Sequence, residues 1–217
     1  MLKKNKTALV LSTLALLLPM LVGIVLWNRF PDSIPIHWNA AGDADGWGSK
    51  ATAVFFLPLF ILAMHWLCIF ATTLDPKHQE IQGKMLHLVI WICPFISLVC
   101  NSFVYAAALG YDLSVEILMP LLLGAMFLII GNYLPKCKRN YTIGIKVSWA
   151  LEDDENWNAT HRFAGKVWVL GGAVIMATSF LGLSTVFFVI TMLMAFVPII
   201  YSYLYYRKHK KEDKHGN

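Results

Sequence analysis

Residues 3–27 read KKNKTALVLSTLALLLPMLVGIVLW: lysines are followed by 21 residues without a charge, from Thr7 to Trp27. About 20 apolar residues are needed for a helix to cross the hydrocarbon core of a bilayer. A basic start before an apolar run also occurs in signal peptides, but here Asn28-Arg29-Phe30-Pro31 stands where a small-x-small cleavage site would be. We therefore interpret this stretch as a retained first transmembrane span.

Five further apolar stretches make up most of the remaining chain. The protein is 58% hydrophobic and 14% charged, with a mean hydropathy of +0.59, which is too apolar for a soluble domain of this length. The stretches are residues 52–73, 86–109, 118–134, 167–183 and 185–205. The last two together are too long for one span, so we predict a tight helical hairpin that turns at residues 182–184. The sequence thus predicts one all-α integral membrane domain, residues 1–217, with six transmembrane helices.

The basic residues indicate how these spans are oriented. Of the 18 Lys and Arg residues, all but Arg29 and Lys50 fall at the amino end, in the second and fourth gaps between spans, or in the tail. The positive-inside rule assigns those segments to the cytoplasm, so we expect both termini there. Clusters of this kind next to a membrane suit anionic lipid headgroups. We therefore expect membrane lipid as a partner and no direct contact with nucleic acid.

The first gap, residues 28–50, is the longest of the predicted external loops. The alternation of Ile34, Ile36 and Trp38 is typical of a strand, and the following glycines favour a turn. We predict a small hairpin at the membrane surface, where tryptophan side chains suit the interfacial belt. Its candidate recognition residues are Pro31, Pro35, His37, Trp38, Gly42, Asp45, Gly46 and Trp47.

Two sharper interpretations of this loop have less support. Asp43-Ala44-Asp45-Gly46 resembles half of a calcium loop, but the further oxygen ligands and the closing Glu of an EF-hand are missing. We therefore expect no metal site. His37 is a candidate pH sensor, although a lone histidine beside tryptophan is more often a packing residue at the interface.

The fourth gap, residues 135–165, is the largest predicted cytoplasmic loop. Strand-like residues around Gly144 predict an extended hairpin or a re-entrant turn over residues 141–150. The acidic residues 152–155 predict a helix start, because negative charge is favourable in the first turn. Trp157, His161 and Trp168 then recur at helical spacing. This spacing predicts an amphipathic helix along the inner interface that bends into the fifth span.

The sequence contains no recognisable catalytic set. His161 has acidic residues nearby, but the chain has no H-E-x-x-H motif, nucleophile elbow or phosphate-binding glycine loop. We therefore expect no catalytic residues, no cofactor and no enzymatic activity. The four cysteines form no C-x-x-C pair and are expected to be packing residues. Within the spans, His65 and Asn101 are the main polar residues, for which interhelical hydrogen bonding is the simpler role and a transport pathway the alternative.

Both large loops carry ordered motifs. The motif Phe30-Pro31-x-x-Ile34-Pro35-x-His37-Trp38-Asn39, with Gly42 and Asp45-Gly46-Trp47 after it, resembles a short amino-terminal domain of unknown function found in many small bacterial membrane proteins. The second motif resembles the carboxy-terminal signature of the SdpI family, and its candidate residues are Asn132, Asn140, Gly144, Lys146, Trp149, Trp157, Thr160, His161 and Arg162. The resemblance divides the membrane domain into an amino-terminal unit, residues 7–73, and an SdpI-like unit, residues 118–205.

The resemblance implies a six-span protein of the bacterial plasma membrane without enzymatic activity. The founding member of the family gives immunity to a secreted peptide toxin that attacks membranes, and it relays the presence of the toxin by drawing a transcriptional repressor to the membrane. A peptide toxin outside and a cytoplasmic repressor are therefore the expected partners. This chain departs from the family's usual Arg-Thr-Pro-Trp with Lys146-Val147-Ser148-Trp149. Loss of the planar guanidinium fork weakens any bidentate contact made at that position.

Three functions are consistent with these observations. An immunity protein or receptor is favoured, because each side of the membrane has one structured loop and neither loop has a catalytic set. A small transporter that uses His65 and Asn101 is the alternative, and a membrane enzyme is the least supported.

Overall fold

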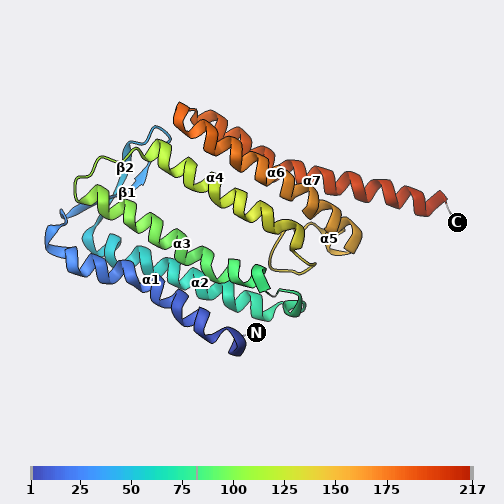
Figure 1. The fold of residues 1–217 in the computed structure, drawn as a ribbon, viewed down its shortest axis with the longest axis horizontal. Helices are drawn as coiled ribbons and strands as arrows, with labels where there is room; N and C mark the ends of the chain where they lie inside the picture. Colours follow the sequence, from blue (N-terminus) through green and yellow to red (C-terminus); the bar gives the residue numbers. More distant parts are fainter. Residues whose placement is uncertain (1, 82, 216–217) are drawn as a thin grey trace. The chain divides into compact units, whose positions relative to one another are not determined.

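The computed structural model describes residues 2–81 and 83–215, and within these ranges six helices are long and apolar enough to cross a membrane. They are α1 (Lys6–Leu26), α2 (Leu57–Leu74), α3 (Gly83–Ala108), α4 (Val115–Tyr133), α6 (Asp154–Thr178) and α7 (Ser184–His215) (Figure 1). The other elements are a short helix α5 (Ser148–Leu151), strands β1 (Ser33–Trp38) and β2 (Ala44–Ser49), and short 3-10 or π-helical turns. The prediction of an all-α multipass membrane protein is confirmed.

The chain forms two compact units. The first comprises residues 1–74 and 82–115, and so holds the first three long helices and both strands. The second comprises residues 75–81 and 116–217, and so holds the rest of the helices together with the loop between α2 and α3. A short segment from the amino-terminal half of the chain is therefore packed within the carboxy-terminal unit.

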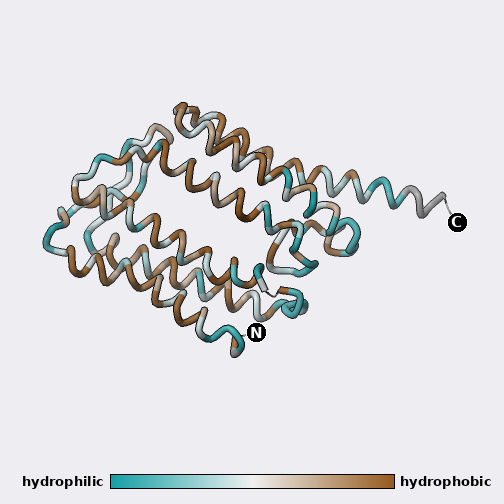
Figure 2. The backbone as a smooth tube through the Cα atoms, in the orientation of Figure 1, coloured by the Kyte–Doolittle hydropathy of each residue, from teal (hydrophilic) through white to brown (hydrophobic). Residues whose placement is uncertain are grey.

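In the first unit, α1, α2 and α3 are neighbouring helices (Figure 1). Near the start of α1, Leu9 shares a buried cluster with Ile69 of α2 and Leu86 of α3. Toward the other end, the Tyr105 hydroxyl on α3 donates a hydrogen bond to the carbonyl oxygen of Pro19 on α1 at 3.0 Å. Hydrophobic residues predominate along the helices, and hydrophilic residues gather where the helices end (Figure 2). This is the pattern that a lipid environment requires.

The strands β1 and β2 pair antiparallel and confirm the predicted hairpin. Asn39 Oδ1 holds the turn by accepting hydrogen bonds from the backbone N–H groups of Ala41 at 2.9 Å and Asp43 at 3.0 Å. Gly42 supplies the positive φ of +88° that the turn requires. Ile34 is fully buried in a cluster that includes residues of α3. One face of the hairpin is thereby fixed on the helix ends.

In the second unit, glycines allow α4 and α6 to approach closely. A Cβ on Gly172 of α6 would lie 2.5 Å from the carbonyl oxygen of Gly124 on α4, and a Cβ on Gly165 would lie 2.8 Å from that of Gly131. Small residues are the usual contacts between membrane helices, because apolar surface alone gives little drive to associate in lipid. After α6 the chain turns at Gly182, which has a φ of +63°, and α7 packs against α6. The predicted helical hairpin is thus present.

Before the fifth span, the predicted extended hairpin and the predicted interfacial helix are wrong. Residues 141–150, all of which the structure describes, contain no strand: they form a loop that runs into α5. Residues 154–178 form one continuous helix, so no break separates an interfacial part from the span. The reason is that Trp157 and His161 are buried in protein and do not lie along a lipid interface. The predicted helix start is correct, since Asp153 is the N-cap and accepts a hydrogen bond from the N–H of Glu155 at 2.8 Å.

We expect the hairpin to face outside and the loop before α5 to face the cytoplasm, because the basic residues concentrate on the latter side. In a chain whose four native cysteines are replaced by alanine, Asp43→Cys should react with a membrane-impermeant maleimide in intact cells. Lys138→Cys should react only after permeabilisation. The reverse pattern, or equal labelling at both positions, would refute this orientation.

Candidate functional site

Residues 137–147, named here the signature loop, connect the 3-10 turn η5 (Leu134–Lys136) to α5. The loop has no regular secondary structure, yet polar contacts fix it to itself, to α6 and to residues 75–81. A polar group that is buried without a hydrogen bond is costly, so the contacts that satisfy these groups determine the path of the loop.

Asn140 organises the first half of the signature loop and is 1% exposed. Its Oδ1 accepts hydrogen bonds from the N–H groups of Thr142 at 2.9 Å and Ile143 at 2.7 Å. Its Nδ2 donates to the carbonyl oxygen of Lys138 at 2.8 Å. An aspartate could accept the same two bonds but could not donate the third, so the geometry requires the amide.

His161 of α6 holds the second half of the loop. Its Nδ1 donates to the carbonyl oxygen of Trp157 at 2.8 Å, and its Nε2 accepts from the N–H of Ile145 at 3.0 Å. This pair of bonds requires the neutral ring with its proton on Nδ1. Gly144 has a φ of +108°, and a Cβ there would collide with His161 Nε2 and lie 3.2 Å from the Trp157 ring. Glycine at 144 therefore lets the backbone reach the histidine.

Trp157 supports the hydrogen bond between Ile145 and His161 by stacking on the His161 ring. It is fully buried, and its ring stacks on the His161 ring with 4.1 Å between centroids. Its Nε1 donates to the carbonyl oxygen of Cys137 at 2.7 Å, which fixes the beginning of the loop. Burial raises the pKa of the Cys137 thiol to about 11, so the thiol stays protonated near neutral pH.

Asp75, in the loop that follows α2, holds the signature loop from the other side. One carboxylate oxygen accepts from the Tyr141 N–H at 2.8 Å and the Thr142 hydroxyl at 2.7 Å, and the other accepts from the Lys77 N–H at 2.7 Å. Burial acts to raise the pKa of this carboxyl, but the hydrogen bonds outweigh burial and hold the pKa below its ordinary value. The carboxylate is therefore ionised at neutral pH and accepts all three bonds.

A second buried polar cluster joins α5, α6 and α7. The Asn156 Oδ1 accepts from the hydroxyls of Thr160 and Ser202, both at 2.9 Å, and its Nδ2 donates to the Ser202 carbonyl oxygen at 3.1 Å. The Nε1 of Trp149 donates to the Ser202 hydroxyl at 3.1 Å. The α5 helix, which follows the signature loop, is thereby tied to α7. Arg139 adds an ion pair with Asp154 at the start of α6.

The structure brings together six of the nine predicted residues of this region and leaves three on the surface. Asn140, Gly144, Trp149, Trp157, Thr160 and His161 belong to the two buried networks described above. Asn132, Lys146 and Arg162 are exposed. Both His161 nitrogens are used in structural bonds, which leaves this ring no free group for acid–base chemistry in this conformation. Among the described residues, no group of three or more His, Cys, Asp or Glu side chains could hold a metal ion.

The predicted external residues form the hairpin. Pro35 is buried, Trp38 is half-buried, and Pro31 is exposed at the start of the loop. On the free side, His37 Nδ1 contacts Asp45 Oδ1 across the strands, and Trp47 is 59% exposed. Gly46 is close-packed, because a Cβ there would lie 2.7 Å from the His37 Cβ, and Gly42 forms the turn. The hairpin thus presents an aromatic ring beside a polar pair.

The two polar residues within the spans differ in their contacts. His65 of α2 is fully buried and its Nε2 lies 3.3 Å from the Ser12 hydroxyl of α1, which confirms an interhelical role. Asn101 instead donates to the Ser97 carbonyl oxygen of its own helix at 2.8 Å, so the interhelical prediction is wrong for this residue. A polar side chain in a helix can donate to a carbonyl group of the preceding turn, and spacing along the sequence does not reveal whether it bonds there or across helices.

Asp75, Asn156 and Ser202 were not predicted as site residues. Each had a weak signal in the sequence. Asp75 precedes Pro76 after an apolar run, which is typical of a turn at a helix end. Asn156 lies four residues before Thr160, on the same helix face. Ser202 is a small hydroxyl residue within a span, and such residues often bond across helices.

Comparison with known proteins gives one match over the signature loop and another over the hairpin. The sequence model of the SdpI/YfhL protein family matches residues 136–202, a range that contains the signature loop and both buried networks apart from Asp75. A domain of unknown function (DUF1648) matches residues 14–62, a range that contains the hairpin.

One curated relative aligns from end to end. The immunity protein SdpI of Bacillus subtilis (strain 168) is 27% identical over 213 residues, which cover 95% of this chain and 97% of that protein. No solved structure matches the chain. This chain is thus a multipass membrane protein whose carboxy-terminal part matches the SdpI/YfhL family and which is similar over nearly its whole length to an immunity protein.

Proposed function

We propose that this protein gives its cell immunity to a secreted, membrane-active peptide. The similarity to an immunity protein over 95% of the chain supports the proposal. The site supports it as well, because the polar residues of the signature loop are engaged in holding the backbone and provide no catalytic set. We propose that the protein acts by binding the peptide.

The hairpin is the surface that we assign to the peptide. Trp47 is 59% exposed beside the His37–Asp45 pair, while the buried face of the hairpin is anchored through Ile34. An exposed tryptophan next to polar groups matches an amphipathic peptide that lies at the membrane surface, since one ring contacts apolar side chains while neighbouring polar groups bond its backbone. The rigid hairpin lowers the cost of ordering the site on binding.

The signature loop is the surface that we assign to a cytoplasmic partner. The single observation that carries this assignment is that Asn140, His161 and Asp75 hold the backbone of the loop by hydrogen bonds. The side chains that point outward from the loop therefore have fixed positions. These side chains include Tyr141, which is 50% exposed, Lys146, and Lys138, whose ammonium group is paired with Glu80 at 2.7 Å. A fixed aromatic and basic surface suits an acidic partner protein. We infer that such a partner is a transcriptional repressor that this loop recruits to the membrane.

Expression of the chain in a toxin-sensitive strain should raise the peptide concentration needed for half-maximal killing. Trp47→Ala should reduce this protection by about tenfold or more, because exposed tryptophans at binding surfaces often contribute 2 kcal/mol or more. Tyr111→Ala is the matched control, since Tyr111 is also an exposed aromatic residue on the predicted outer side. No gain in survival against a panel of membrane-active peptides, at normal membrane levels of the protein, would contradict the immunity proposal for those peptides.

Recruitment should be separable from immunity. Lys146→Glu changes an exposed charge without touching the buried contacts of the loop, so we expect protection to persist while a toxin-responsive transcriptional reporter loses most of its induction. Lys166→Glu, an equal charge change at an exposed position of α6 outside the loop, should leave the reporter response intact. Loss of protection and response together in Lys146→Glu, with normal membrane levels, would rule out divided roles.

A further inference from the structure

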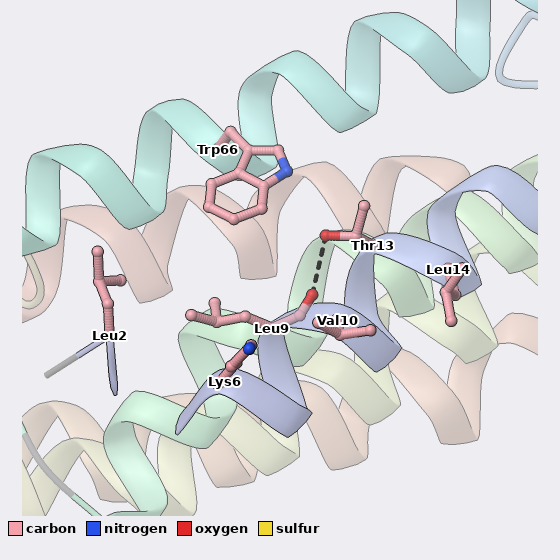
Figure 3. Close-up of a pocket in the computed structure, with 7 residues that line it drawn as sticks. All are labelled: Leu2, Lys6, Leu9, Val10, Thr13, Leu14 and Trp66. Atoms are coloured by element: carbon pink, nitrogen blue, oxygen red, sulfur yellow. Dashed lines mark hydrogen bonds between the residues drawn. The ribbon is translucent and has the colours of Figure 1, made fainter. Parts of the chain in front are cut away.

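Beside the start of α1 lies an apolar pocket that the immunity proposal does not use. It has a volume of about 450 Å³ and is lined by Leu2, Lys6, Leu9, Val10, Thr13 and Leu14 of the α1 segment together with Trp66 of α2. The indole of Trp66 lies across the pocket from the side chains of α1 (Figure 3). The Thr13 hydroxyl donates to the Leu9 carbonyl oxygen at 2.8 Å, so its proton is not available to a ligand.

We propose that this pocket binds one acyl chain of an anionic phospholipid, with the lipid phosphate on Lys6. The length of the pocket fits an acyl chain. From Lys6 to Leu14 the helix advances about 12 Å, and one leaflet of the hydrocarbon core is about 15 Å deep. The lining residues lie along one helix face and are apolar except at Lys6 and Thr13. An apolar groove that extends through most of one leaflet and has a cation at its headgroup end matches the chemical pattern of a phospholipid.

The charge distribution favours an anionic headgroup over a zwitterionic one. Lys3, Lys4 and Lys6 precede the apolar run, whereas the acidic residues of the first unit are Asp32, Asp43, Asp45 and Asp112, in the hairpin region and after α3. Among the described residues, Lys6 makes no ion pair with a carboxylate of this chain. A lysine next to the membrane that has no protein carboxylate as partner attracts an anionic lipid phosphate.

Trp66 supplies the wall of the pocket and a polar group. Its ring is 42% exposed, and Leu9 on the opposite wall is buried. The contact between His65 and Ser12 fixes α2 against α1 at this level. Within the described ranges, the Trp66 indole N–H has no hydrogen-bond acceptor in the protein, so it is available to a lipid ester carbonyl.

Quenching of tryptophan fluorescence by brominated lipids tests the proposal on the full chain in bilayers. The contribution of Trp66 is the difference between wild-type protein and Trp66→Phe. We expect brominated phosphatidylglycerol to quench this contribution with about fivefold higher affinity than brominated phosphatidylcholine, which corresponds to about 1 kcal/mol, the size of one lysine contact with an anionic membrane surface. Lys6→Gln should remove the preference.

Lys84→Gln is the matched control, because Lys84 is an exposed lysine at the start of α3 that does not line the pocket; it should keep the preference. Equal quenching by both lipids in wild-type protein, or a preference that survives Lys6→Gln, would overturn the proposal. Concentration-dependent exclusion of both brominated lipids from Trp66 would show instead that a second copy of the chain covers the pocket, and would overturn it as well.

Discussion

The hydrogen bond from the Ile145 N–H to His161 Nε2 is the contact on which the signature loop depends. It joins a segment without regular structure to a transmembrane helix, and it requires three other features at once. Residue 144 must be glycine, because a Cβ there would collide with His161. The His161 proton must be on Nδ1, where it is donated to the Trp157 carbonyl oxygen, so that Nε2 can accept from Ile145. The Trp157 ring must stack on the His161 ring. Because each feature depends on the others, the signature is a single structural unit, and a change at any of these residues acts on the whole loop.

The spans, the hairpin and the helix start at Asp153 could be predicted because each depends on residues that are close in sequence: apolar runs, turn formers and a capping side chain. The loop could not. The oxygen of Asp75 that fixes Tyr141 lies 66 residues away in the chain, and no local pattern reveals such a pairing. The β-branched residues near Gly144 favoured a strand, but a strand needs a partner, and the polar contacts of Asn140 and His161 bend the backbone instead. This loop buries Trp157 and His161, so the predicted position of their helix at a lipid interface is wrong.

The structure accommodates Lys146 and Ser148, which stand where the family motif usually has arginine and proline. Lys146 is exposed, so the change from arginine affects what the loop presents and leaves its internal bonds intact. Ser148 is the first residue of α5, a position where proline is well tolerated because its N–H has no partner within the helix. Trp149, which follows the family pattern, keeps its hydrogen bond to Ser202. The scaffold of the signature is thus retained, while the surface that would meet a partner differs.

Hydrogen exchange at residues 137–147 tests most directly whether His161 holds the signature loop. In the wild-type protein we expect slow exchange at Ile145. His161→Ala should accelerate it by about fivefold to 150-fold, because a lost hydrogen bond that leaves a buried donor unsatisfied costs about 1–3 kcal/mol. Exchange in α7 should not change, and His87→Ala, at an exposed histidine of α3, should have no effect on the loop. Fast exchange at Ile145 in wild-type protein, or an unchanged rate in His161→Ala, would contradict the central role given to this contact.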